Sequence, residues 1–163
     1  NLQPGCAIKC FAVYDKPFWR DAGWSGSAIS DQEPVHTCFD VTPPGESRGI
    51  LMAFIEGRDA QDYSDRTEDE RKAVTLKTLE QLFGHQAATP IAYYDHSWKS
   101  DEWARGCYAG VPKAGHWTSV GHLIREPHGR VFWAGTETAV EWNGYFEGAV
   151  RAGFRAAEQV ISV

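Results

Sequence analysis

The 163-residue sequence lacks any run of Lys or Arg and has a net charge of −6, so we do not expect it to bind nucleic acid. It contains no stretch of about 18 apolar residues, and it therefore predicts no membrane-spanning helix. No signal peptide opens the chain and no hydrophobic anchor closes it, so we expect a soluble protein without membrane partners. Because Asn1 is not an initiator Met, we expect the chain to be part of a longer protein.

Cysteine is also scarce. No Cys-x-x-Cys or His-x-x-x-His pair is present, and the six histidines show no ligand spacing, so we expect no metal site. Free thiols in the cytoplasm are expected rather than disulfides, because the chain is not a small cysteine-dense scaffold. The sequence has neither a Gly-x-Ser-x-Gly motif nor a P-loop. The four cysteines are Cys6, Cys10, Cys38 and Cys107.

Aromatic residues, in contrast, are abundant: 7 Trp, 6 Tyr and 8 Phe make up 13% of the chain. So many rings suit a pocket for a flat or apolar ligand. A rigid core uses them as well, so composition alone leaves both interpretations open.

Apolar patterning predicts strands in the first half of the chain. Residues 7–14 are apolar on both faces apart from Lys9, so we expect a strand covered on both sides. As an isolated residue, Lys9 could equally reach solvent from an edge strand. Turn signals separate further strands, which favours an antiparallel meander. These strands are predicted at residues 25–30, 35–41 and 50–55.

The clearest helix before the C-terminal segment spans residues 67–83. Thr67 and Glu70 form a capping box at its start, and Gly84 is a stop signal at its end. A further strand is expected at residues 90–95. The aspartates between residues 59 and 69 are interpreted as a solvated acidic surface.

The C-terminal segment has a different character. A short apolar strand at residues 131–134 is expected to enter a turn at Gly135-Thr136-Glu137. A helix at about 145–161 follows, and its Gly and Ala residues make it thin enough for close backbone approach. Its N-terminus suits an anion or a carbonyl that gains negative charge. A plain close-packed helix is the alternative.

Together these patterns predict an α+β fold. Residues 1–100 are interpreted as an antiparallel or mixed sheet with the helix at 67–83. Residues 101–163 are interpreted as a loop followed by a strand–helix piece of a Rossmann-like domain, which needs neighbouring strands to pair with. No internal repeat is present.

Three sequence stretches resemble flavin-dependent amine oxidases of the monoamine oxidase type. They are the Gly-Thr-Glu turn with Trp-Asn-Gly-Tyr-Phe-Glu-Gly after it, a W-x8-C-Y-x6-G segment that begins at Trp98, and Ile-Lys-Cys followed by Pro-Phe-Trp-Arg. The resemblance covers nearly the whole chain. No G-x-G-x-x-G loop is present, so the chain resembles the C-terminal part of such an enzyme: part of the substrate domain and the last FAD-binding segment.

The resemblance implies residues that bind FAD. Cys107 occupies the position whose sulfur bonds to the flavin 8α-methyl carbon, although Arg105 stands where these oxidases commonly have Gly; a small buried thiol is the alternative. The helix start would face the flavin, with the N–H of Phe146 toward O2. The remaining cofactor-binding positions are Gly135, Thr136, Glu137, Gly144 and Tyr145.

The resemblance also implies catalytic residues. Lys9 would hold a water against flavin N5, because a Lys among apolar neighbours is costly to bury in its charged form. Tyr108 and Tyr145 would form an aromatic cage that attracts an ammonium group and orients the free amine. As isolated residues, either tyrosine would suit ordinary packing.

The resemblance therefore predicts an FAD-dependent oxidase that converts a primary or secondary amine to an imine and aldehyde while O2 becomes H2O2. We expect this chain to bind FAD poorly and to be inactive without an N-terminal FAD-binding part. A non-catalytic binding or assembly fragment and a polyamine oxidase relative are the alternatives. Oligomeric state, including a homo-oligomer, stays open.

Overall fold

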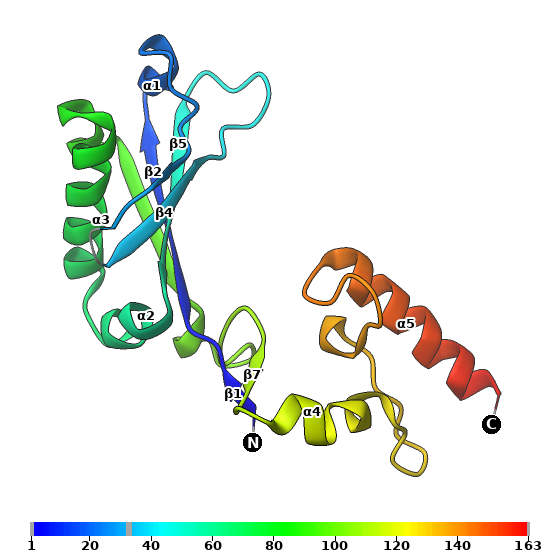
Figure 1. Cartoon of the computed structure of the whole chain (residues 1–163). Helices are drawn as coiled ribbons and strands as arrows, with labels where there is room; N and C mark the ends of the chain where they lie inside the picture. The colour runs from blue at the N-terminus through cyan, green and yellow to red at the C-terminus, as the bar shows by residue number, and fades with distance from the viewer. Residues whose placement is uncertain (1, 32–33, 163) are drawn as a thin grey trace. The chain divides into compact units, whose positions relative to one another are not determined.

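The computed structural model describes residues 2–31 and 34–162. The chain divides into two compact units: one runs from Cys6 to Cys107, and the other combines the residues before Cys6 with those from Tyr108 onward. Helices and antiparallel sheets make the fold α+β, as predicted (Figure 1). The functional division near residue 100 stays a prediction.

The first unit is built on a five-stranded antiparallel sheet in the order β3-β4-β5-β2-β6. The predicted strand at 7–14 is confirmed as β2, and the predicted meander is confirmed as β3, β4 and β5. β2 lies between β5 and β6, so the edge-strand interpretation of Lys9 is wrong. The strands are β2 (Ala7–Tyr14), β3 (Ala28–Ile29), β4 (Val35–Asp40), β5 (Gly49–Glu56) and β6 (Ala92–Ser97).

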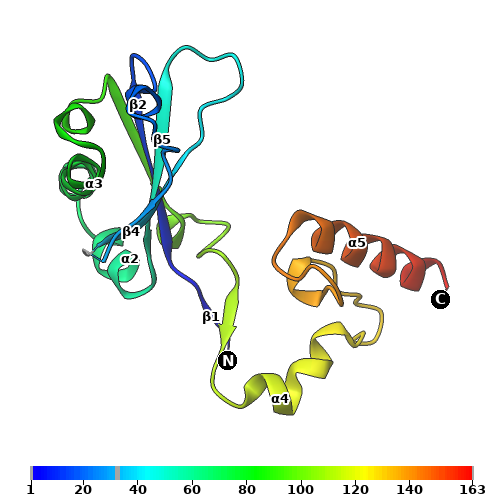
Figure 2. The same cartoon turned by 45° about the horizontal axis from the view of Figure 1, so that its top comes forward.

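Helices cover one face of this sheet. Figures 1 and 2 show α2 (Gly57–Ser64) and α3 (Glu68–Phe83) on the same side of the strands. The predicted capping box of α3 is confirmed: the N–H of Glu70 donates to Thr67 Oγ1 at 3.2 Å, and the N–H of Thr67 donates to Glu70 Oε2 at 2.9 Å. The sequence did not predict α2. The first unit also contains two short helices, α1 (Phe18–Asp21) and η1 (His85–Ala88).

The core lies between α3 and the face of β2 that carries Ile8, Cys10 and Ala12, all fully buried. The opposite face, with Lys9, Phe11 and Val13, is only half-buried. The expectation that both faces of β2 are covered is therefore wrong for the described residues. Alternating burial follows because the helices of this unit lie on one side of the sheet alone.

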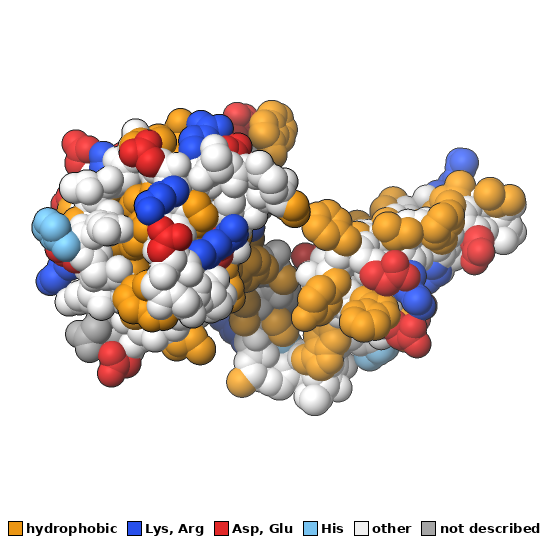
Figure 3. Space-filling view, turned by 90° about the horizontal axis from the view of Figure 1, so that it is seen from above, with side chains coloured by type: hydrophobic (Ala, Val, Ile, Leu, Met, Phe, Trp, Pro, Cys, Tyr) orange, Lys and Arg blue, Asp and Glu red, His pale blue; other side chains and the backbone are white. Residues whose placement is uncertain are grey.

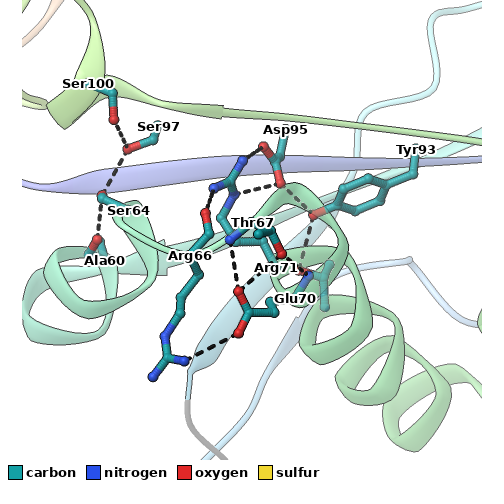
Figure 4. Close-up of polar contacts among 11 residues, drawn as sticks. Ala60, Ser64, Arg66, Thr67, Glu70, Arg71, Tyr93, Asp95, Ser97 and Ser100 are labelled. Carbon is teal, nitrogen blue, oxygen red and sulfur yellow. Dashed lines mark hydrogen bonds and ion pairs between the residues drawn. The ribbon is translucent and has the colours of Figure 1, made fainter.

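Polar contacts attach α3 and α2 to β6 (Figure 4). Arg71 of α3 donates two hydrogen bonds to Asp95 of β6, at 2.9 and 2.7 Å, and Tyr93 donates a third at 3.2 Å. On α2, Ser64 Oγ accepts a hydrogen bond of 2.8 Å from Ser97. These contacts fix the end of β6, from which the chain continues into the loop that leads to Cys107.

The second unit pairs β1 (Leu2–Pro4) with β7 (Gly110–Pro112) and continues through short helices to a long one. The predicted C-terminal helix is confirmed as α5 (Phe146–Ile161). The predicted strand at residues 131–134 is wrong: Val131 forms only an isolated bridge with His128, because the described residues supply no neighbouring strand to pair with. The intervening helices are α4 (His116–Val120), η3 (Gly121–Arg125) and η4 (Thr136–Thr138).

One side of α5 packs within this unit, where Gly148 and Ala152 are buried. Apolar residues elsewhere on the helix are exposed, including Val150, Phe154 and Ile161. Figure 3 shows apolar side chains along the surface of this unit. None of the helices in the described part of the chain has the length and apolar character needed to cross a membrane.

Candidate functional site

Lys9 projects from the interior strand β2 onto the sheet face opposite α3. Its cross-strand partners are Phe54 on β5 and His96 on β6. In an antiparallel sheet, directly opposed residues lie on the same face, so these three side chains are neighbours. The Lys9 ammonium lies 5.7 Å from the centroid of the Phe54 ring. This geometry holds a cation against an aromatic face beside half-buried apolar residues.

Cys107 closes the loop that begins at η2 (Trp98–Ser100). Its thiol is partly exposed, while Cys6, Cys10 and Cys38 are buried free thiols. Burial raises the pKa of Cys107, the positive charge of Lys9 lowers it, and the negative charge of Glu56 raises it. The structure therefore brings two sequence-predicted site residues, Lys9 and Cys107, within electrostatic reach of each other.

The loop before Cys107 has an unusual backbone. Arg105 has φ of 54°, in the left-handed region that favours glycine, and Gly106 has φ of 151°. The amine oxidases that the sequence resembles commonly have Gly where this chain has Arg105. The loop thus adopts a turn that glycine would accept without strain, despite the substitution.

Thr136 organises the turn before α5. Its hydroxyl accepts a hydrogen bond of 2.7 Å from the N–H of Gly144 and donates one of 3.0 Å to the carbonyl of Tyr145. A Cβ at Gly148 would overlap the carbonyl oxygen of Trp142 and lie 3.0 Å from Thr136 Oγ1. A side chain at Gly148 would therefore force the turn away from the helix. The predicted close backbone approach of this helix is confirmed at that position.

Two arginines that the sequence did not predict as site residues hold the same turn. Arg155 of α5 donates to the carbonyls of Thr138 and Trp133 at 2.6 and 2.7 Å. Arg125 donates to the carbonyls of Thr138 and Ala139 at 3.0 Å each. Backbone carbonyls outside regular structure need such donors. No motif in the sequence marks either arginine.

The start of α5 has no side-chain cap. Tyr145 is the N-cap residue and its side chain makes no capping hydrogen bond. Since the first turn of a helix has N–H groups without intrahelical partners and a positive dipole end, it suits an anionic or carbonyl oxygen. Phe146, the first residue of α5, is 94% exposed. Gly135 and Glu137, which the resemblance predicts to contact the cofactor, lie in the adjoining turn.

The two tyrosines of the predicted cage, Tyr108 and Tyr145, are 59% and 67% exposed. Within the second unit neither tyrosine is therefore a core residue. The Tyr145 ring lies edge-on to Trp142, with centroids 6.1 Å apart. Lys9 and Cys107 belong to the first unit, whereas both tyrosines belong to the second.

Each unit carries polar groups that a ligand could contact. No group of three or more His, Cys, Asp or Glu residues that could hold a metal ion occurs among residues 2–31 and 34–162. In the second unit these polar groups are the N–H groups at the uncapped start of α5, and in the first unit the thiol of Cys107. Trp98 adds a buried indole N–H without a hydrogen-bond partner, next to His96 on the Lys9 face.

Comparisons with known proteins show the family of the chain. The family model described as flavin containing amine oxidoreductase matches residues 1–161. AofH of Mycobacterium tuberculosis, named as a flavin-containing monoamine oxidase, is 44% identical over 98% of this chain and 34% of its own length. The flavin-containing amine oxidase of Danio rerio is 39% identical over 99% of this chain and 31% of its own length.

Solved structures of amine oxidases share the fold. Putrescine oxidase bound to putrescine has a TM-score of 0.90 at 36% identity, covering 96% of this chain and 35% of that one. Cyclohexylamine oxidase from Brevibacterium oxydans has a TM-score of 0.90 at 34% identity, covering 97% and 35%. This chain thus spans about a third of the length of the proteins it matches.

Proposed function

The chain belongs to the flavin-containing amine oxidoreductase family, and we propose that it supplies part of the substrate domain and the last FAD-binding segment of an amine-oxidising enzyme. One observation carries the proposal beyond family membership. Lys9, on an interior strand, and Cys107, at the end of a loop, lie within electrostatic reach in one unit. These are the two residues of the first unit to which we assign roles at the flavin.

The bound flavin would accept a hydride equivalent from the α-carbon of a primary or secondary amine and pass electrons to O2, giving H2O2. Lys9 would hold a water molecule on the sheet face opposite α3 and exchange a proton with it through Nζ. Cys107 would fasten the flavin covalently. The neighbouring Lys9 charge favours the thiolate of Cys107 and opposes the effect of burial on its pKa.

Tyr108 and Tyr145 would form the amine cage. Two exposed ring faces attract an ammonium group and then orient the neutral amine, which is the form that loses hydride. A substrate amine is supported by the two solved relatives, named for putrescine and cyclohexylamine oxidation. Both tyrosines are required, since one ring alone fixes no direction.

The second unit would contact the carbonyl edge of the flavin ring. Gly135, Thr136 and Glu137 would run along the FAD, while the turn from Gly144 to Phe146 would direct N–H groups at the flavin carbonyl. The Thr136 hydrogen bonds to Gly144 and Tyr145 preorganise this turn before any ligand binds.

The whole activity requires more than this chain, which matches only about a third of its relatives. We propose that an N-terminal part with a G-x-G-x-x-G loop binds the FAD pyrophosphate and completes the site. The four free thiols, none of them paired in a disulfide, suit a reducing compartment such as the cytoplasm.

Reconstitution tests the proposal. Residues 1–163 are mixed with a separately expressed N-terminal FAD-binding part, and flavin absorbance is followed with and without denaturation. We expect a yellow complex only with both parts, flavin retained after denaturation in wild type, and flavin released in Cys107→Ala. Submicromolar FAD binding by residues 1–163 alone, or no flavin in the mixture, contradicts the proposal. Release from wild type refutes the covalent bond.

A further inference from the structure

His96 is the residue of β6 directly opposite Lys9. Because directly opposed residues share a face, the imidazole lies beside the Lys9 side chain on the sheet face opposite α3. β6 is an edge strand, and nothing in the proposed reaction uses this histidine. The contacts of His96 nevertheless link Lys9 to the loop that carries Cys107, and these are the two residues of the first unit with proposed roles at the flavin.

Two contacts hold the His96 ring. His96 Nε2 lies 3.5 Å from Asp101 Oδ2, and the ring packs edge-on against Trp98, with centroids 4.6 Å apart. Lys9 on β2 and Asp101 on the following loop therefore present opposite charges to the imidazole. The other titratable groups near this face are Tyr94 on the same strand, with Glu56 and Cys107 beside Lys9.

Asp101 is also the residue that shapes the loop. Its Oδ1 accepts the N–H of Trp103 at 3.0 Å and the N–H of Ala104 at 2.7 Å. Its own carbonyl accepts the N–H of Arg105 at 3.0 Å. Two residues later the loop reaches Cys107, whose thiol experiences the Lys9 charge. His96 and Asp101 thus join the loop end to the strand pair that carries Lys9.

We propose that His96 is a positioning residue that, through Asp101, fixes the Cys107 loop beside Lys9. The protonated imidazole would attract Asp101, and the Asp101 carboxylate would offset the repulsion between that imidazolium and the Lys9 ammonium. Loss of the proton on His96 loosens the loop. The inference rests on the proposed flavin roles of Lys9 and Cys107, but its test needs no flavin.

Alkylation by iodoacetamide reports on Cys107 selectively, because the other three cysteines are buried. The Cys107 thiol is already partly exposed, so a loosened loop should expose it further and raise the alkylation rate. The alkylation rates of residues 1–163 and of the His96→Gln variant are compared at about pH 5.5 and about pH 8.5. At the lower pH we expect the alkylation rate of His96→Gln to be about two- to fivefold higher than that of wild type, which is the effect expected from loss of an exposed ion pair. At the higher pH the two rates should be equal.

His85→Gln is the matched control, because His85 also pairs with an exposed carboxylate, that of Glu80, at 2.7 Å. The His85→Gln variant should have the wild-type rate of Cys107 alkylation at both pH values. Equal alkylation rates for His96→Gln and wild type at the lower pH overturn the proposal. A rate difference of the same size at both pH values also overturns it, because it indicates altered packing.

Amide hydrogen exchange in the wild type gives a second test that needs no variant. After correction for intrinsic exchange, the Trp103 and Ala104 amides should be about two- to fivefold more protected at the lower pH. Equal protection overturns the proposal. Failure of FAD binding in the reconstitution would contradict the proposed function while leaving both results unaffected.

Discussion

Arg71 and Asp95 form a two-point ion pair between α3 and β6, with N···O distances of 2.9 and 2.7 Å. The Asp95 side chain is only 2% exposed. The pair therefore holds the main helix against the strand that leads to η2 and the Cys107 loop. A carboxylate this deeply buried depends on its partners for compensation.

Arg71→Ala should lower the free energy of unfolding by about 3–5 kcal/mol, because it leaves the buried Asp95 charge unpaired. Urea unfolding followed by circular dichroism measures this. Arg48→Ala is the control, since Arg48 pairs with Glu46 on the surface, and its midpoint should match wild type. A small effect for Arg71→Ala would mean that the pair does not anchor α3.

Acid stability should depend on Asp40. Burial alone would raise its pKa, yet hydrogen bonds from Thr42, Trp19 and Arg20 lower the pKa to about 2. Because the folded value lies below the unfolded value of about 3.9, the carboxylate stabilises the fold above pH 4, and this stability is lost as pH falls toward 2.

Asp40→Asn should therefore flatten the decline of the urea midpoint between about pH 4 and pH 2 and lower the midpoint at neutral pH. Asp21→Asn, at an exposed ion pair with Lys16, should keep the wild-type decline. An Asp40→Asn profile parallel to wild type across this range would exclude Asp40 as the group responsible.

Two glycines of α5 should respond oppositely to Ala. At Gly148 the new methyl group would overlap the Trp142 carbonyl, so we expect a cost of about 1–3 kcal/mol and a displaced turn at Thr136. At Gly153 nothing lies within 4 Å of the new atom, so Ala should stabilise the helix by up to about 1 kcal/mol. Thermal unfolding compares them, and equal effects would contradict the described packing.

Local signals in the sequence predicted local structure well. The apolar residues at 7–14 predicted β2, and the Thr67 and Glu70 capping box predicted the start of α3, because both signals depend on neighbouring residues alone. The strand at residues 131–134 failed because pairing needs strands that the described residues do not provide. Helix α2 was missed because its aspartates resemble a solvated surface, although Asp59 contacts His36 at 3.0 Å.

The candidate site was predictable only in part. Resemblance indicated Lys9 and Cys107, and the structure places them within electrostatic reach of each other in one unit. No periodicity or motif pointed to His96, Arg125 or Arg155, because their importance depends on register and on carbonyls far along the chain. The convergence of Tyr108 and Tyr145 with Lys9 stays a prediction, since it depends on how two separate units come together.

The most direct test of the account is the kinetics of Lys9→Met in the flavin-loaded enzyme. Amine-driven flavin reduction without oxygen and reoxidation by O2 are measured separately by stopped flow, with Lys16→Met, which alters an exposed ion pair, as the control. We predict that one half-reaction slows by about 100-fold, the usual contribution of a positioned proton-transfer group. Wild-type rates in both half-reactions would contradict a role for Lys9 in catalysis.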